Sequence, residues 1–147
     1  NCIDEKSLPI YGKGLNIRDW LFVDDHCDAI NIVLKKGKIG DTYNIGGKNE
    51  IRNIDIVRTI CSLLDKMKPR NNNLSYSDLI TFVADRPGHD YRYAIDFTKI
   101  NKELNWHPQI NFEDGIRRTI KWYLEHESWW DNINKTKYNQ ERLGIKK

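Results

Sequence analysis

Two arginines stand where folding alone does not call for a charged side chain. Arg18 interrupts the otherwise apolar run from Ile17 to Val23, and an unpaired cation within a buried strand is costly. Arg86 and His89 flank Pro87-Gly88 in a segment of loop-forming residues, and loops that follow buried strands often carry ligand-binding groups. Because a guanidinium presents a planar fork of donors that suits phosphate, these residues indicate an anion site.

Each candidate also has a structural interpretation, and these alternatives stay open. Arg18 would form a salt bridge with Asp19 or with a helix carboxylate, and the loop around Arg86 would be a turn with exposed charges. Tyr11, at the end of an apolar run, would either stack on a flat base or pack against its neighbours. Asn53 is expected to cap a helix, and a capped helix end also presents amides to an anion.

The sequence contains no catalytic or metal-binding motif that stands by itself. Gly12-Lys13-Gly14 lacks the third glycine and the following helix of a phosphate loop, and there is no Tyr-x-x-x-Lys, Gly-x-Ser-x-Gly or His-Glu-x-x-His. The cysteines Cys2, Cys27 and Cys61 have no zinc-ligand spacing. Cys27 and Cys61 are predicted to be small buried side chains within helices. We therefore expect no metal and no complete catalytic centre in this chain.

Composition favours one globular domain. The chain has 147 residues, 39% of them hydrophobic, 31% charged and 11% aromatic, with five Trp, which is too aromatic for a disordered chain. No apolar stretch reaches the roughly 18 residues of a membrane span, and no signal peptide is recognisable. The chain opens without Met, which suggests a missing upstream segment. The few, scattered cysteines favour a reducing compartment, so we expect a cytoplasmic protein.

Charge divides the chain into two unequal parts. The formal net charge is only +3, so the overall field is weak, but basic residues concentrate at the C-terminus. We predict a domain over residues 1–132 and a basic tail over residues 133–147. The tail is interpreted as a solvated end, with contact to nucleic acid or membrane as the alternative, and neither partner is expected for the domain.

Strands and helices alternate in the predicted secondary structure, which favours an α/β fold. We expect Asp24 and Asp25 to cap one helix and Asn111 to cap the last long one. The expected strands cover residues 8–11, 17–23, 41–45, 79–83 and, as an option, 93–95; the expected helices cover residues 24–36, 53–67, 98–104 and the segment from 111 onward.

Four segments that contain these candidates resemble one known family. They are Leu8-Pro9-Ile10-Tyr11-Gly12-Lys13-Gly14, Ile17-Arg18-Asp19-Trp20-Leu21, Tyr43-Asn44-Ile45-Gly46-Gly47 and Ala84-Asp85-Arg86-Pro87-Gly88-His89-Asp90. In this order they look like the C-terminal half of the dTDP-glucose 4,6-dehydratases, which are extended short-chain dehydrogenases/reductases. Arg-Asp-Trp followed by Val23-Asp24-Asp25-His26 separates this pattern from the related hexose epimerases. The resemblance extends from residue 1 to about residue 132.

The resemblance implies a fold and a set of binding residues. The fold would be the small C-terminal substrate-binding domain, without the Rossmann domain that binds NAD. By resemblance, the thymine pocket would be lined by Pro9, Ile10 and Tyr11; the phosphates would contact Arg18 and Asn53; and the loop closing over the diphosphate and ribose would be Asp85, Arg86, Pro87, Gly88 and His89. Arg86 would be the main cation. Asn105 replaces a usual Gly at a helix end, where Asn tolerates the left-handed conformation.

The resemblance also implies a reaction and partners. The family converts dTDP-glucose to its 4-keto-6-deoxy product with tightly held NAD, and its NAD-binding and acid–base residues belong to an N-terminal half that this sequence does not contain. We therefore expect the chain to bind a dTDP-sugar without turnover, to combine with a separate N-terminal half if one exists, and to be monomeric, although full-length members are usually homodimers. The alternative is a non-catalytic anion-binding or interaction module that retains the fold.

Overall fold

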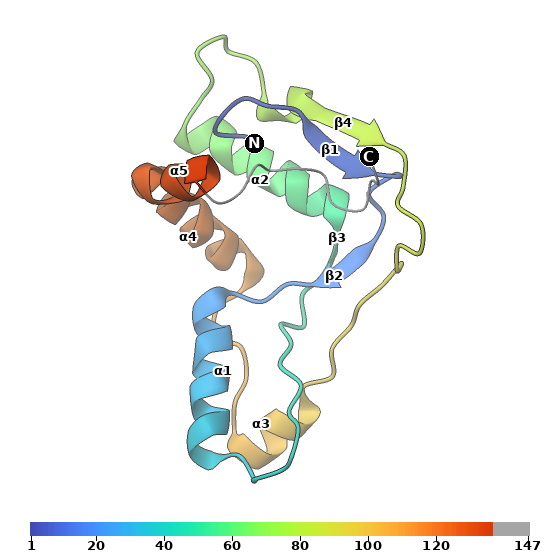
Figure 1. Cartoon of the computed structure of the whole chain (residues 1–147), viewed down its shortest axis with the longest axis vertical. Helices are drawn as coiled ribbons and strands as arrows, with labels where there is room; N and C mark the ends of the chain where they lie inside the picture. The colour runs from blue at the N-terminus through green and yellow to red at the C-terminus, as the bar shows by residue number, and fades with distance from the viewer. Residues whose placement is uncertain (137–147) are drawn as a thin grey trace.

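The computed structural model describes residues 1–136 and has the expected α/β character (Figure 1). In chain order the elements are β1 (Leu8–Tyr11), β2 (Ile17–Asp19), α1 (Val23–Lys36), β3 (Glu50–Arg52), α2 (Asn53–Met67), the short 3-10 helix η1 (Tyr76–Leu79), β4 (Ile80–Val83), α3 (Thr98–Leu104), α4 (Phe112–Glu125) and α5 (Glu127–Thr136). One end of the molecule contains β1, β4 and α2, and the other contains α1 and α3 (Figure 1).

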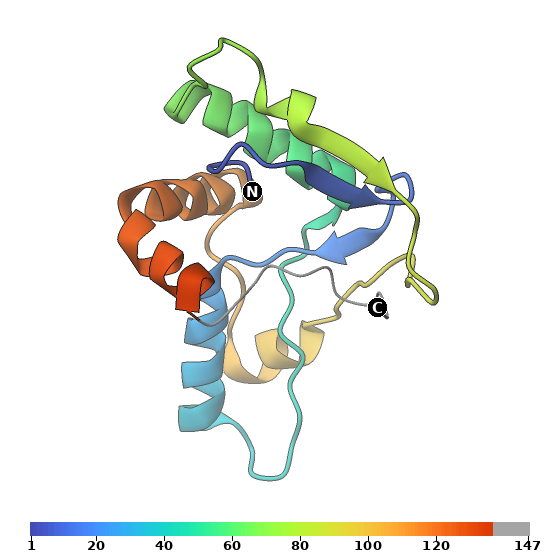
Figure 2. The same cartoon turned by 45° about the horizontal axis from the view of Figure 1, so that its top comes forward.

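Two small sheets position the loops that carry the candidate site residues. β1 and β4 are parallel, with Leu8 opposite Ile80 and Tyr11 opposite Val83, whereas β2 and β3 are antiparallel. Because parallel strands end at the same edge, the segments that follow β1 and β4 emerge together (Figure 2). The segment after β4 then returns to β2, where Ile17 exchanges backbone hydrogen bonds with Tyr91 and Tyr93.

Each end of the molecule has its own hydrophobic core. The apolar stripe of α2 packs with β1, η1 and α4 in a cluster whose buried members are Leu8, Cys61, Leu64, Tyr76 and Ile120. A second cluster joins α1 to α3 through Ala29, Ile100 and Trp106. The predicted helical stripe of α2 is confirmed at Ile54, Cys61 and Leu64, which are all buried.

The predicted caps of α1 are wrong. α1 begins at Val23 with Phe22 in the N-cap position, so Asp24 and Asp25 lie within its first turn. The Asp25 carboxylate is buried and accepts hydrogen bonds from the backbone amides of Gln109 and Ile110, at 3.1 and 3.0 Å. The Asp25 carboxylate therefore accepts hydrogen bonds from amides just before α4, and the sequence around Asp25 does not indicate these distant partners.

The strand predictions are correct only where a partner strand is present. Residues 41–45 form no strand, and Tyr43 and Ile45 pack against the α1–α3 core instead. The strand predicted over 17–23 ends at Asp19, and its partner β3 was not predicted. The optional strand over 93–95 does not form, apart from an adjacent single bridge between Ile17 and Arg92.

Several smaller expectations have clear outcomes. Asn111 caps α4 by accepting a hydrogen bond from the Asp114 amide at 2.8 Å, as predicted. Asn105 adopts the expected left-handed conformation after α3, with φ of 53°. Cys27 is exposed, so the prediction that it is buried is wrong, whereas Cys61 is buried.

The last helix extends past the predicted domain boundary. α5 runs across the predicted boundary at residue 132 as far as Thr136, and residues 137–147 of the predicted tail lie outside the described residues. Among residues 1–136, no helix combines the length and hydropathy needed to span a bilayer. The same residues contain no group of three or more His, Cys, Asp or Glu side chains arranged for a metal ion.

Candidate functional site

The candidate site begins at the shared edge where β1 and β4 end. Tyr11 is the last residue of β1, and Asp85 follows β4 by two positions. The Gly12 amide donates to the Val83 carbonyl at 2.9 Å, which keeps the two chain segments together beyond the strands. A Cβ atom at Gly12 would lie 2.9 Å from Asp85 Oδ2, and φ there is +55°. The positive φ is the feature that favours glycine at this position.

Asp85 organises the loop that follows β4. Its Oδ1 accepts a hydrogen bond from the Arg86 amide at 2.9 Å and contacts His89 Nδ1 at 2.7 Å. The hydrogen bond with His89 is the main reason that the pKa of Asp85 is lowered from its usual value. The His89 ring meets the Tyr11 ring edge to face, with centroids 6.0 Å apart. Tyr11, Asp85 and His89 are thus brought together.

Arg18 is bound to the loop that follows β4. Its Nη1 donates to the Ile17 carbonyl at 2.6 Å and its Nη2 to the Asp90 carbonyl at 3.0 Å. Its guanidinium carbon lies 4.4 Å from the centre of the Tyr93 ring, within the range of a cation–π interaction. These contacts use two of the five guanidinium N–H groups.

The alternative in which Arg18 forms a salt bridge with Asp19 is wrong. Asp19 instead accepts hydrogen bonds from the backbone amides of Gly47 and Asn49, at 2.9 and 2.8 Å. Asp19 and Arg18 are neighbours in a strand, so their side chains project to opposite faces. The Asp19 carboxylate therefore anchors the Gly46-Gly47 turn, and the Arg18 guanidinium remains on the side of the loop.

Arg86 presents a second guanidinium to this surface. It is exposed, and within residues 1–136 its side chain makes no hydrogen bond or ion pair. Its charge and that of Arg18 both act on the Tyr93 hydroxyl. Tyr93 donates that hydroxyl to Asp90 Oδ2, and this hydrogen bond raises the pKa of Tyr93. Arg18 is thus bound to the same loop that carries Arg86. We call Tyr11, Arg18, Asp85, Arg86 and His89 the strand-end cluster.

Asn53 does not cap α2, contrary to prediction. It is the first residue of the helix, and Arg52 occupies the N-cap position without a side-chain cap. The amides of Asn53 and Ile54 donate to the carbonyls of Asn16 and Gly14, at 2.9 and 3.0 Å. The first two amides of α2 are therefore satisfied within the protein, and any contact from Asn53 to phosphate would come from its side chain.

The three residues predicted to line a thymine pocket divide between two faces of β1. Ile10 is only 6% exposed and packs in the core, whereas Pro9 is exposed and Tyr11 partly so. Alternate residues of a strand point to opposite sides. β1 thus presents Pro9 on the same face as Tyr11, and the Ile10 side chain on the opposite face. Pro87 and Gly88 are exposed in the loop between Arg86 and His89.

Asn16 and Tyr93 are site residues that the sequence did not single out. Asn16 is buried, its amide group donates to the Asp90 carbonyl at 3.1 Å, and its backbone carbonyl receives the Asn53 amide. It connects the loop before β2, the loop after β4 and the start of α2. The sequence does contain a signal for Asn16, because it is a polar residue between Leu15 and Ile17, two positions before Arg18.

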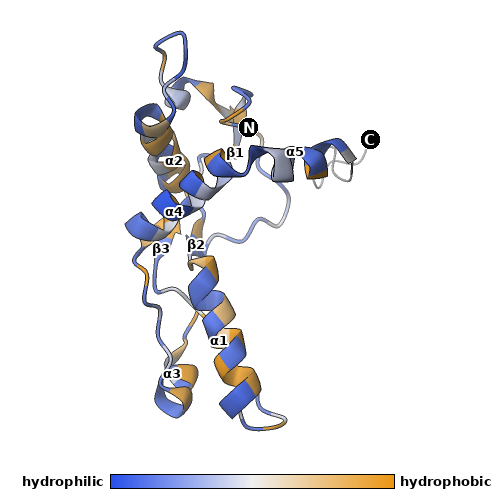
Figure 3. Ribbon diagram, turned by 90° about the vertical axis from the view of Figure 1, so that its left-hand side faces the viewer, coloured by the Kyte–Doolittle hydropathy of each residue, from blue (hydrophilic) through white to orange (hydrophobic). Residues whose placement is uncertain are grey.

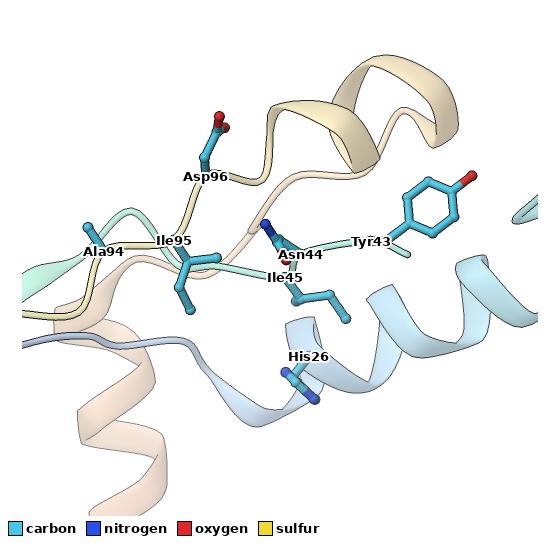
Figure 4. A pocket seen from close by; sticks show the side chains of 7 residues that line it. All are labelled: His26, Tyr43, Asn44, Ile45, Ala94, Ile95 and Asp96. Atoms are coloured by element: carbon cyan, nitrogen blue, oxygen red, sulfur yellow. The ribbon is translucent and has the colours of Figure 1, made fainter. Parts of the chain in front are cut away.

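A separate pocket of about 510 Å³ lies between the start of α1, the segment around Tyr43 and the segment before α3 (Figure 4). It is lined by His26, Tyr43, Asn44, Ile45, Ala94, Ile95 and Asp96. The His26 and Asp96 side chains point away from one another (Figure 4), and Asp96 accepts a hydrogen bond from the Thr98 amide at 2.8 Å. These two groups do not form an acid–base pair, and none of the sequence-predicted site residues lines this pocket.

Comparison with known proteins connects this geometry to a family. A family model described as GDP-mannose 4,6 dehydratase matches residues 2–119. A probable dTDP-glucose 4,6-dehydratase from Sinorhizobium fredii is 55% identical over 145 residues, which are 99% of this chain and 41% of that protein. The chain thus spans about two fifths of the length of this curated relative.

Solved structures show the same relationship. The dTDP-glucose 4,6-dehydratase of Bacillus anthracis in complex with NAD superposes with a TM-score of 0.77 at 46% identity, over 90% of this chain and 39% of that one. The corresponding enzyme of Streptomyces venezuelae, also with NAD bound, has a TM-score of 0.77 at 41% identity, over 90% and 38%. These matches confirm the resemblance drawn from the sequence motifs. Since the family match covers most of the chain, the protein belongs to the GDP-mannose 4,6-dehydratase family of extended short-chain dehydrogenases/reductases.

Proposed function

We propose that this chain is the nucleotide-sugar-binding part of a dTDP-glucose 4,6-dehydratase, the enzyme that converts dTDP-glucose to dTDP-4-keto-6-deoxyglucose. The observation that carries the proposal is the strand-end cluster, in which Arg18 binds the loop that carries Arg86, beside the aromatic rings of Tyr11 and His89. Cations next to aromatic rings suit a ligand that joins a diphosphate to a flat base.

The two arginines would have different tasks in binding. Arg18 is already committed to the carbonyls of Ile17 and Asp90, so it stabilises the loop and has further N–H groups for a phosphate oxygen. Arg86 is the exposed cation, and a phosphate would give it the charge-assisted hydrogen bonds that it lacks within the described chain. Binding energy gained here would hold the sugar in place for chemistry elsewhere.

The described residues do not fit the NAD that the related structures contain. The two sheets of this chain have two strands each among the described residues. Within residues 1–136, no glycine-rich loop leads from a strand into the N-terminus of a helix. That loop is what dinucleotide sites of this class use to bind the pyrophosphate. We therefore propose that NAD and the acid–base residues come from an NAD-binding half outside this sequence, and that the 147 residues alone do not turn over.

The surface of α1 supports such a partner. Val23, Ile30 and Leu34 are 60%, 44% and 81% exposed, and their spacing of seven and four residues places them on one side of the helix. Apolar residues appear as orange segments along α1 in Figure 3. Exposed apolar stripes mark interaction sites. We propose that this stripe contacts the NAD-binding half.

The alternative function is a non-catalytic anion-binding module, and the exposed Arg86 is compatible with it as well.

Thermal melts of the purified chain with dTDP, and with UDP as the control, distinguish the nucleotide-sugar-binding function from the anion-binding module. A ligand at 100 times its Kd stabilises the folded state by about 2.7 kcal/mol, so the proposal predicts a clear rise of Tm with dTDP and little with UDP. Equal, salt-sensitive rises with both nucleotides would favour the anion module. A melt that neither nucleotide changes would contradict both.

A further inference from the structure

A buried asparagine lies between the segments that carry the candidate phosphate-binding residues. Among residues 1–136, Asn16 and Asp25 are the two buried polar or charged residues, at 7% and 3% exposed. Burial of an amide side chain costs free energy unless its polar atoms are hydrogen-bonded. The hydrogen bonds of Asn16 therefore indicate its role.

The Asn16 side chain holds the end of the loop that follows β4. Its Nδ2 donates to the Asp90 carbonyl at 3.1 Å, and Arg18 Nη2 donates to the same carbonyl at 3.0 Å. A carbonyl oxygen has two lone pairs, so these two donors together satisfy it. The loop thus meets β2 at a single carbonyl that is bound by one buried and one partly exposed side chain.

Backbone hydrogen bonds continue this attachment. The Ile17 amide donates to the Tyr91 carbonyl at 2.8 Å, and the Tyr93 amide donates to the Ile17 carbonyl at 3.1 Å. At the other end of the loop, the Gly12 amide donates to the Val83 carbonyl at 2.9 Å. The loop is therefore held at both ends.

Contacts within the loop fix its shape but not its place. Asp85 Oδ1 accepts a hydrogen bond from the Arg86 amide at 2.9 Å and contacts His89 Nδ1 at 2.7 Å. The place of the loop relative to β2 is set at the Asp90 carbonyl, which comes directly after His89. The attachment of that carbonyl therefore influences where Arg86 lies.

The backbone of Asn16 adds the start of α2 to the same arrangement. The Asn16 carbonyl accepts a hydrogen bond from the Asn53 amide at 2.9 Å. Asn16 is thus hydrogen-bonded to the loop that carries Arg86 and to the first residue of α2, and it lies two positions before Arg18. Arg18, Asn53 and Arg86 are the three candidate phosphate contacts.

A bound ligand would affect Asn16 and Arg18 differently. Arg18 is partly exposed and has N–H groups beyond the two that bind carbonyls, so a phosphate oxygen can attract its guanidinium. Asn16 is buried, so a ligand at the surface leaves its hydrogen bond in place. The loop therefore keeps one attachment that does not depend on Arg18.

We propose that Asn16 is a positioning residue for nucleotide binding, whose buried side chain holds the loop that carries Arg86 in register with Arg18 and Asn53. The inference rests on the proposed nucleotide-sugar function. Asn16 acts through the loop and not by contact with the ligand. When a loop adopts its binding arrangement for only part of the time, the apparent affinity falls by that fraction.

The test replaces each of two asparagines by leucine in the full 147-residue chain. Asn16→Leu retains the branched shape of the side chain and removes its amide donor. Asn101→Leu is the matched control, because Asn101 Nδ2 also donates to a carbonyl at 3.1 Å, that of Trp106, and the Asn101 carbonyl also accepts a backbone amide, that of Asn105 at 3.0 Å. Asn101 lies on α3, at the opposite end of the molecule from β1 and β4 (Figure 1).

Titration with dTDP measures the effect on binding. The Kd should rise by up to about 10-fold in Asn16→Leu, the factor that one lost hydrogen bond allows, and it should stay unchanged in Asn101→Leu. Asn16→Ala removes the same donor with a smaller side chain and should raise the Kd similarly. Asn16→Gln retains an amide donor and should bind more tightly than Asn16→Leu.

Two readouts distinguish positioning from a general loss of stability. In the Arg86→Ala background, Asn16→Leu should change the Kd by less than about 2-fold, because the loop then has no guanidinium to position. Hydrogen exchange of the Ile17 and Tyr93 amides should accelerate in Asn16→Leu, while the Gly12 amide keeps its protection and Asn101→Leu alters none of the three.

Equal Kd values for wild type and Asn16→Leu, with dTDP binding intact, would overturn the inference and leave the proposed function standing. The same would follow if Asn16→Leu raised the Kd equally with and without Arg86, because the role of Asn16 would then be merely structural. A wild-type chain that binds no dTDP would contradict the proposed function, and this inference with it.

Discussion

Replacing Arg86 by alanine should weaken nucleotide binding without weakening the fold. Within residues 1–136 the Arg86 side chain makes no hydrogen bond or ion pair, and substitutions at such surface positions change the free energy of unfolding by about 0.5 kcal/mol or less. A hydrogen bond to a charged group contributes about 1.5–3 kcal/mol. The Kd for dTDP should therefore rise by roughly 10-fold to 150-fold, with Tm of the free protein nearly unchanged.

Arg18→Ala provides the contrast. This change removes hydrogen bonds to the carbonyls of Ile17 and Asp90 and the contact with the Tyr93 ring. For a partly exposed group these contacts together stabilise the fold by about 2 kcal/mol, so Tm should fall by roughly 6 °C. Binding should weaken as well, because the loop after β4 loses its anchor.

The assay is isothermal titration of each variant with dTDP, with thermal melts of the free proteins alongside. Arg117→Ala is the matched control, because Arg117 is an exposed arginine on α4, away from the strand-end cluster. An unchanged Kd in Arg86→Ala, with binding intact in the wild type, would refute the assignment of Arg86 as the main cation. A fall of Tm as large as that of Arg18→Ala would show that the structural account of Arg86 is wrong.

Two further predictions concern carboxylates. Asp25→Ala leaves the amides of Gln109 and Ile110 without their buried acceptor, so the free energy of unfolding, measured in urea, should fall by about 2–4 kcal/mol. Asp25→Asn keeps one acceptor oxygen, so its free energy of unfolding should fall by less. A fall below about 1 kcal/mol in Asp25→Ala would contradict the assigned role. Asp85 has a folded-state pKa below its ordinary 3.8 because of His89, so its carboxylate stabilises the fold above that pH and the stabilisation is lost as the pH falls through the lowered pKa. In melts from pH 7 to pH 2.5, the difference between wild type and Asp85→Asn should therefore shrink below pH 3.8, and a difference that persists in acid would count against the Asp85–His89 contact.

Regular helices with a continuous apolar stripe could be predicted from sequence because their signal is local. α2 has the predicted buried stripe through Ile54, Cys61 and Leu64, and α4 has the predicted cap at Asn111. Helix periodicity depends on residues three and four positions apart, so distant parts of the chain do not alter it. The predicted strand over residues 41–45 does not form, because a strand exists only where a second strand supplies its hydrogen bonds.

The hydrogen bonds made by polar groups near helix starts were the least predictable part of the structure. Asp25 was expected to cap its own helix, but it accepts amides 84 and 85 positions away. Asn53 was expected to cap α2, but the carbonyls of Gly14 and Asn16 take the first helix amides. A polar side chain near a helix start has several possible partners of similar energy, and local sequence does not choose among them.

The sequence by itself determined the helical segments α1 to α4, the family resemblance and the identity of the anion-binding candidates, because these depend on residue type, order and local spacing. It identified both Arg18 and Arg86 but assigned them the same chemistry. Only the tertiary structure decided that Arg18 is committed to a carbonyl 72 positions away, whereas Arg86 has no such contact among the described residues. The reason is physical: a guanidinium bonds to whichever acceptors the folded backbone places within about 3 Å of it, and those acceptors come from segments that are distant in the sequence.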